Sequence, residues 1–121
     1  MLHPAILTTT ADAGMALPHP DVLRGIFEQA DSPLVVLDAG GRIRHVNPAF
    51  ETNTGYRAGE LDGQRSSVLC AHLYSSDFFR GIVRRLRRER RWQGEIWSRR
   101  RNGEEVPEWL SINALDRKSV V

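Results

Sequence analysis

The sequence is poor in cysteine, in lysine and in long apolar runs, and the shortages of cysteine and of apolar runs each exclude a class of protein. Cys70 is the single cysteine among 121 residues, which excludes an internal disulfide framework and a multi-cysteine metal site and favours a reducing, cytoplasmic setting. No run approaches the roughly 18 to 20 apolar residues that span a bilayer. Residues 1–20 lack the basic start and continuous apolar stretch of a secretory signal. We therefore expect a cytoplasmic chain without a membrane segment.

What is present fits one small globular domain. The chain is 40% hydrophobic and 26% charged, and its length allows one core but not two. Residues 1–20 hold three of the six prolines and a Thr-Thr-Thr run without periodicity. We therefore expect residues 1–19 to form a mobile leader and residues 20–121 to form a single domain.

Charge is segregated along the chain although the formal net charge is only +2. Ten arginines stand against two glutamates between Arg80 and Arg101. Such a stripe can bind phosphates, but a helix that packs on a sheet must turn its polar residues outward in any case. Arginine supplies 16 of the 17 basic residues, which indicates a compositional bias. We therefore expect no nucleic-acid partner, and an acidic protein or a downstream domain can supply the counter-charge.

Periodicity and turn residues predict helices alternating with strands. Capping residues and prolines predict helices from Asp21 to the Ser32-Pro33 break, over 48–54 behind the cap Asn47, over 56–61, and from Ser75 or Ser76 onward. Two hairpins are predicted, with strands at 34–37 and 42–46 and at 92–101 and 104–115. Pro107 removes one donor, so its part of the strand needs an edge or a bulge. Residues 64–74 are predicted to be a loop with helical turns.

Two stretches carry a family resemblance. Residues 38–63, DAGGRIRHVNPAFETNTGYRAGELDG, resemble the N-terminal half of a PAS domain. Residues 91–115, RWQGEIWSRRRNGEEVPEWLSINAL, are similar to the Gβ–Hβ hairpin of PAS domains found upstream of bacterial diguanylate cyclase and phosphodiesterase modules. The first stretch matches at Asp38, Gly41, Arg42, Ile43, Val46, Asn47, Ala49, Phe50, Thr54, Gly55, Tyr56, Glu60, Leu61 and Gly63.

The resemblance implies an α+β fold, a five-stranded antiparallel sheet in the order B-A-I-H-G with helices on one face. The four predicted strands correspond to A, B, G and H. Strand I, which lies in the centre of the family's sheet, is largely missing, because residues 116–121 are too few to form it. We therefore expect either a C-terminally truncated fragment of a longer signalling protein or a sheet that a neighbouring copy completes, because unpaired edges favour pairing with another chain.

The resemblance further implies a sensory and interaction module that regulates an output domain outside this chain, either an enzyme of cyclic di-GMP turnover or a histidine kinase. The expected partners are a second copy or that downstream domain, together with a small-molecule ligand held between sheet and helices. Asn47 is expected to cap a helix and not to touch a ligand. The candidate pocket residues are Val36, Phe50, Tyr56, Leu69, Phe79, Trp97, Leu110 and Ile112.

Catalysis and cofactors find less support. Glu104 and Glu105 fit a solvated hairpin end, and no nucleophile elbow precedes Ser66 and Ser67, so we expect no enzyme and no metal site. Ser66 stands where flavin-binding relatives of the light-oxygen-voltage type carry the adduct-forming cysteine, and a serine cannot supply a thiolate. Haem is a less favoured alternative, with His72 as the candidate axial ligand and His45 behind it. A constitutive dimerisation module without ligand is the other alternative.

Overall fold

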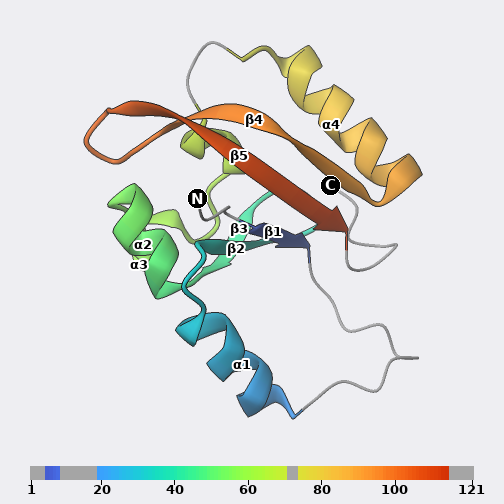
Figure 1. The fold of residues 1–121 in the computed structure, drawn as a ribbon. Coiled ribbons are helices and arrows are strands. Elements are labelled where there is room, and N and C mark those ends of the chain that lie inside the picture. The colour runs from blue at the N-terminus through green and yellow to red at the C-terminus, as the bar shows by residue number, and fades with distance from the viewer. Residues whose placement is uncertain (1–4, 9–18, 71–73, 115–121) are drawn as a thin grey trace.

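The computed structural model of the chain describes residues 5–8, 19–70 and 74–114. Figure 1 shows a twisted sheet with helices around it. The strands are β1 (Ala5–Thr8), β2 (Leu34–Leu37), β3 (Ile43–Val46), β4 (Arg91–Arg99) and β5 (Glu105–Ala114). The helices are α1 (Pro20–Gln29), α2 (Pro48–Thr54), α3 (Ala58–Leu61), the 3₁₀ helix η1 (Ser66–Leu69) and α4 (Ser76–Glu89).

The five strands form one sheet in the order β3-β2-β1-β5-β4. β2 pairs with β3, and β4 with β5, in antiparallel fashion, as two hairpins of neighbouring strands should. β1 lies between the hairpins and runs parallel to both β2 and β5. With β2, β3, β4 and β5 as the family's strands A, B, G and H, β1 occupies the central place of strand I.

β1 corrects two expectations. Residues 5–8 were assigned to a leader, and the centre of the sheet was expected to be open, but these residues fill it. Sequence reasoning could not find the strand because Ala-Ile-Leu-Thr is too short to show a period, and its partners lie some 30 and 100 positions further along the chain. Isolated strands gain their hydrogen bonds only by such pairing.

The boundaries of α2 and α4 follow the predicted caps, whereas α1 begins at Pro20 behind the cap His19 and not at the expected cap Asp21. Asn47 accepts a hydrogen bond from the backbone N of Phe50 at the start of α2, and Gly55 ends that helix at a φ of 82°. Ser75 caps α4 in the same way by accepting from Phe78 N. The expected loop over 64–74 holds η1, and its residues 71–73 lie outside the described part of the chain.

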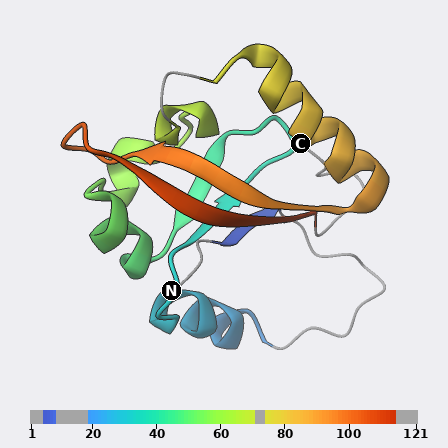
Figure 2. The ribbon, with the colours of Figure 1, turned by 45° about the horizontal axis from the view of Figure 1, so that its top comes forward.

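The core lies on one face of the sheet. Buried apolar residues from four strands meet residues of α2, α3 and α4, so these helices cover the same face. Figure 2 shows α4 above β4 and β5, with α1 at the opposite side of the molecule. The buried residues of this cluster are Val35, Leu37, Ile43, Phe50, Leu61, Ile82, Leu86, Ile96 and Ile112.

Pro107 lies where its missing donor does no harm. In an antiparallel pair, the backbone groups of successive residues point alternately toward and away from the partner strand. Ala114 N donates to Arg90 O, and Glu104 O accepts from Arg100 N, so the even-numbered residues of β5 face β4. The backbone N of residue 107 therefore points away from β4. β1 pairs only with Ser111–Ala114. Pro107 therefore faces a side of β5 that β1 does not cover, and the predicted edge position is confirmed.

Candidate functional site

A cavity of about 340 Å³ lies between the core face of the sheet and the helices. Its walls come from β2, α2, η1, α4, β4 and β5, and the apolar side chains of Leu37, Phe50, Phe79, Ile82 and Leu110 are among them. A volume of this size suits a small ligand, and mostly apolar walls with a few polar groups are typical of binding pockets. The cavity lies where the resemblance places a ligand.

The structure brings five of the eight candidate pocket residues to this cavity and leaves three away from it. Val36, Tyr56 and Trp97 are not among the lining residues. Val36 is buried but lies outside the core cluster, Tyr56 packs against that cluster from outside the cavity, and Trp97 is 42% exposed. The five that line it are Phe50, Leu69, Phe79, Leu110 and Ile112.

The geometry of the β4–β5 turn explains why Trp97 faces away. A two-residue turn over Asn102 and Gly103 would put Trp97 on the same face as Leu110. The observed turn has three loop residues, since Arg100 N donates to Glu104 O and Gly103 N to Arg100 O, with Gly103 at a φ of 91°. This shifts the register by one residue and turns the opposite side chains inward.

The residues that sequence reasoning missed follow from that register. Ile96 pairs with Glu108 and is buried on the cavity side, and Ser98 also lines the cavity. On β2, side chains likewise alternate between the two faces, so Val35 and Leu37 line the cavity and Val36 does not. The Asn102-Gly103 dipeptide predicts a turn but does not fix its length. Whether Arg101 belongs to the loop or to β4 could not be read from the sequence, because arginine has no strong preference for either place.

The polar part of the wall is basic. Arg65, Arg99 and Arg100 line the cavity together with the hydroxyls of Ser66 and Ser67, and among the described residues Glu108 is the only acid on its wall. Glu108 accepts a hydrogen bond from Asn53 Nδ2 at 3.2 Å. The Nε of Arg100 is buried and has no hydrogen-bond partner among the described residues. This part of the wall can therefore accept a polar, negatively charged end of a ligand.

Cys70 lines the cavity directly after η1 and pairs through an isolated β-bridge with Ser98. Burial raises the pKa of the Cys70 thiol from 9.0 to about 11, although the nearby charge of Arg99 opposes the shift. The thiol is therefore a weak nucleophile at neutral pH. Ser66, four residues earlier, also lines the cavity.

We expect iodoacetamide to alkylate Cys70 at pH 8 about 100-fold more slowly in the folded chain than in urea, because a pKa near 11 lowers the thiolate fraction by that factor. The folded state keeps the thiol proton to higher pH than the unfolded state. The resulting stabilisation is present below about pH 9 and is lost as pH rises towards 11. Mass spectrometry measures the rate of alkylation, and Cys70→Ser is the control for the pH dependence of stability. Equal rates in the folded and unfolded states would contradict the raised pKa of Cys70.

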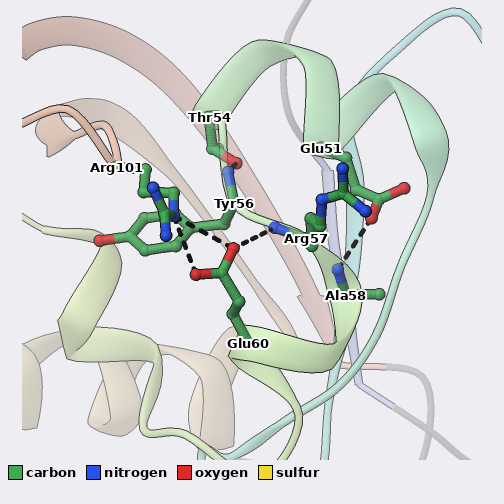
Figure 3. Close-up of polar contacts among 7 residues, drawn as sticks. All are labelled: Glu51, Thr54, Tyr56, Arg57, Ala58, Glu60 and Arg101. Carbon is green, nitrogen blue, oxygen red and sulfur yellow. Dashed lines mark hydrogen bonds and ion pairs between the residues drawn. The ribbon is translucent and has the colours of Figure 1, made fainter.

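A polar cluster joins the tip of the β4–β5 hairpin to α2 and α3 (Figure 3). Arg101 Nε donates to both carboxylate oxygens of Glu60 at 3.1 and 2.8 Å, and Arg101 N donates to Thr54 O at 2.8 Å. Glu60 also accepts from Arg57 N at 3.0 Å. These bonds fix the hairpin beside the end of the cavity that Thr54 lines.

Replacing Glu60 with glutamine should lower the melting temperature at pH 7 by a small amount. Hydrogen bonds from Arg57 N and then from the Arg101 side chain lower the pKa of Glu60 below 4.5. The carboxylate therefore contributes stability above about pH 4.5, and that contribution is lost as pH falls through its folded-state pKa. Melts at pH 7 and pH 3 should show the variant and wild type converging at the lower pH. Glu104→Gln, which removes a surface pair with Arg100, is the control, and a difference that persists at pH 3 would contradict this role.

Of the two haem candidates, the structure describes His45 alone. His72 lies outside the described residues. His45 is exposed on β3 and does not line the cavity. Within residues 5–8, 19–70 and 74–114, no three His, Cys, Asp or Glu side chains cluster in a way that could hold a metal ion. In the same part of the chain no helix has the length and apolar character to cross a membrane.

The PAS domain family model matches residues 31–121, and the chain belongs to this family. The chain is 28% identical over 103 residues to a nitrogen fixation regulatory protein of Klebsiella oxytoca, which covers 85% of this chain and 21% of that protein. It is 27% identical over 86 residues to human high affinity cAMP-specific and IBMX-insensitive 3',5'-cyclic phosphodiesterase 8A, covering 71% of this chain and 10% of that protein. The chain thus spans about a fifth of the first relative and a tenth of the second.

Solved structures agree with the fold. A domain of the sensory box sensor histidine kinase/response regulator from Geobacter sulfurreducens matches with a TM-score of 0.66 and 26% identity, over 75% of this chain and 79% of that one. The chain is therefore similar to a sensory signalling domain in both sequence and backbone. The α+β PAS fold is confirmed, but the expected antiparallel sheet is not, because β1 runs parallel to both of its neighbours and makes the sheet mixed.

Proposed function

We propose that this PAS domain is the sensory module of a bacterial signal-transduction protein and that it binds a small, mostly apolar ligand in the cavity between sheet and helices. The observation that carries the proposal is the cavity of about 340 Å³ with Phe50, Phe79 and Leu110 on its walls. A concave space with mostly apolar walls and a few polar groups is the usual setting of a small-molecule site.

The output would follow from a population shift. A ligand in the cavity would contact both β5 and α4, because residues of both elements line it. If it binds one packing of these elements better than another, it shifts the balance between them by its difference in affinity. β5 ends at Ala114, from where the chain would lead to an output domain. The resemblance of residues 92–112 supports an output in cyclic di-GMP turnover, with a histidine kinase as the alternative.

The proposed ligand can be tested with the chain as purified from cells. Native mass spectrometry and an absorption spectrum of one sample should show an added mass without a visible haem or flavin band. The added mass should be lost in Leu110→Trp, which fills part of the cavity. Val22→Trp, at an exposed position of α1, is the control and should keep it.

Cys70 supplies an independent readout, because its thiol lies on the cavity wall. Small apolar carboxylates, which suit the arginines of the wall, should slow the alkylation of Cys70 in the wild type but not in Leu110→Trp. A chain with no added mass, whose Cys70 reacts at the same rate with and without these compounds, would contradict ligand binding. It would favour the constitutive dimerisation module instead.

A further inference from the structure

We propose that the gap between β2 and β5 is a strand-binding site, and that it takes β1 from a second copy of this chain as well as the chain's own β1. The proposal rests on the placement of β1 and does not depend on a ligand in the cavity. Its partner is a second PAS chain that donates an extended segment of the sequence Ala-Ile-Leu-Thr.

The pairing of β1 is complete on both sides but short. Ala5, Ile6, Leu7 and Thr8 pair with Leu34–Leu37 of β2 and with residues 111–114 of β5. Ile6 has the register position between Val35 and Ile112, two buried residues of the core cluster. Because every backbone group of a central strand needs a partner, this site requires an occupant. The occupant must supply backbone groups at these four positions.

The connection of β1 to the rest of the chain does not dictate which copy supplies it. β1 is a separate strand, whereas β2–β3 and β4–β5 are each held together as a hairpin (Figure 1). The eleven residues 9–19 separate it from α1 and span at most about 40 Å when extended. The same hydrogen bonds form whether β1 comes from the same copy or from another, so exchange costs little once two copies meet.

Helix α1 supports a second copy as the partner. Val22, Leu23 and Ile26 on this helix are 52%, 38% and 61% exposed, and α1 contains no buried residue. Its C-terminal end is held to its own copy by Asn47 Nδ2, which donates to Phe27 O and Ser32 O. When β1 is exchanged, residues 9–19 tether the second copy near this apolar face of α1. Burial of the face against the second copy would then stabilise the dimer.

Cysteine pairs in full-length chains test the exchange, all on a Cys70→Ser background. Neighbouring strands lie about 4.8 Å apart, which suits a disulfide between Ala5→Cys and Ser111→Cys. The double variant, oxidised at high dilution, should form this bond within one chain. Next, an Ala5→Cys chain and a differently tagged Ser111→Cys chain are unfolded together and refolded at about 1 mM, comparable with the effective concentration that a short tether gives.

After dilution and oxidation, we expect a disulfide between the two differently tagged chains. Its yield should be at least ten times higher than in a matched mixture of Ala5→Cys with Val106→Cys, because Val106 lies on β5 but does not pair with β1. Melts of each single variant check that it folds. An intrachain bond in the double variant without a mixed disulfide above the control would overturn the exchange. No intrachain bond in a folded double variant would overturn the site itself. Neither result would affect the cavity, whose ligand is measured separately.

Discussion

Replacing Leu7 with proline should lower the free energy of unfolding by about 3 kcal/mol. β1 is the central strand of the sheet and pairs with β2 on one side and β5 on the other. Proline removes one donor and is tolerated only at edges and bulges. The carbonyl left without its partner adds a cost of about 1–3 kcal/mol when buried. Urea denaturation followed by circular dichroism measures the change.

Ala11→Pro is the matched control for this substitution, because it introduces the same residue three positions after β1 ends. We expect it to change the free energy of unfolding by less than about 1 kcal/mol. The difference between the two variants isolates the contribution of β1 from a general effect of proline on the N-terminal segment. If both variants unfold at the same urea concentration, residues 5–8 do not form the central strand in solution.

Replacing Asn47 with alanine should also cost about 3 kcal/mol or more. Asn47 is fully buried. Its Oδ1 accepts from Leu34 N at 2.8 Å and from Phe50 N at 3.0 Å, while Nδ2 donates to Phe27 O at 3.1 Å and to Ser32 O at 2.9 Å. Alanine removes the cap of α2, worth about 1 kcal/mol, and leaves several buried backbone groups unsatisfied.

The matched control here is Asn53→Ala. Asn53 makes one hydrogen bond, to Glu108 Oε1 at 3.2 Å, so we expect a loss of less than about 1 kcal/mol. Thermal or urea unfolding of both variants compares them directly. A loss in Asn47→Ala as small as in Asn53→Ala would show that the buried hydrogen bonds of Asn47 do not join α1, β2 and α2.

The role of Asn47 shows how far local signals reach. Asn47-Pro48 predicted the start of a helix, and Gly55 its end, and both are confirmed. The bonds from Asn47 to Phe27 O and Ser32 O could not be predicted, because they depend on how a distant helix end packs against the cap. Spacing along the chain identifies an element, but not the elements that lie beside it.

The candidate site shows the same division. Five of the eight predicted residues line the cavity because apolar periodicity identifies which helix and strand residues are buried. Val36 and Trp97 do not line the cavity. For Trp97 the reason is that a one-residue change in turn length exchanges the two faces of a strand. On β2 no turn signal could decide the face, since Val35, Val36 and Leu37 are all apolar and all buried.

The sequence by itself determined the family, the order of elements from α1 to β5 and the caps of α2 and α4, because these depend on residues within a turn or two of one another. The tertiary structure alone decided which residues face the cavity, that Asn47 joins three elements, and that residues 5–8 complete the sheet. The physical reason is that strand pairing and side-chain packing depend on contacts between residues far apart in the chain. A four-residue segment such as β1 carries no local signal of the two strands between which it lies.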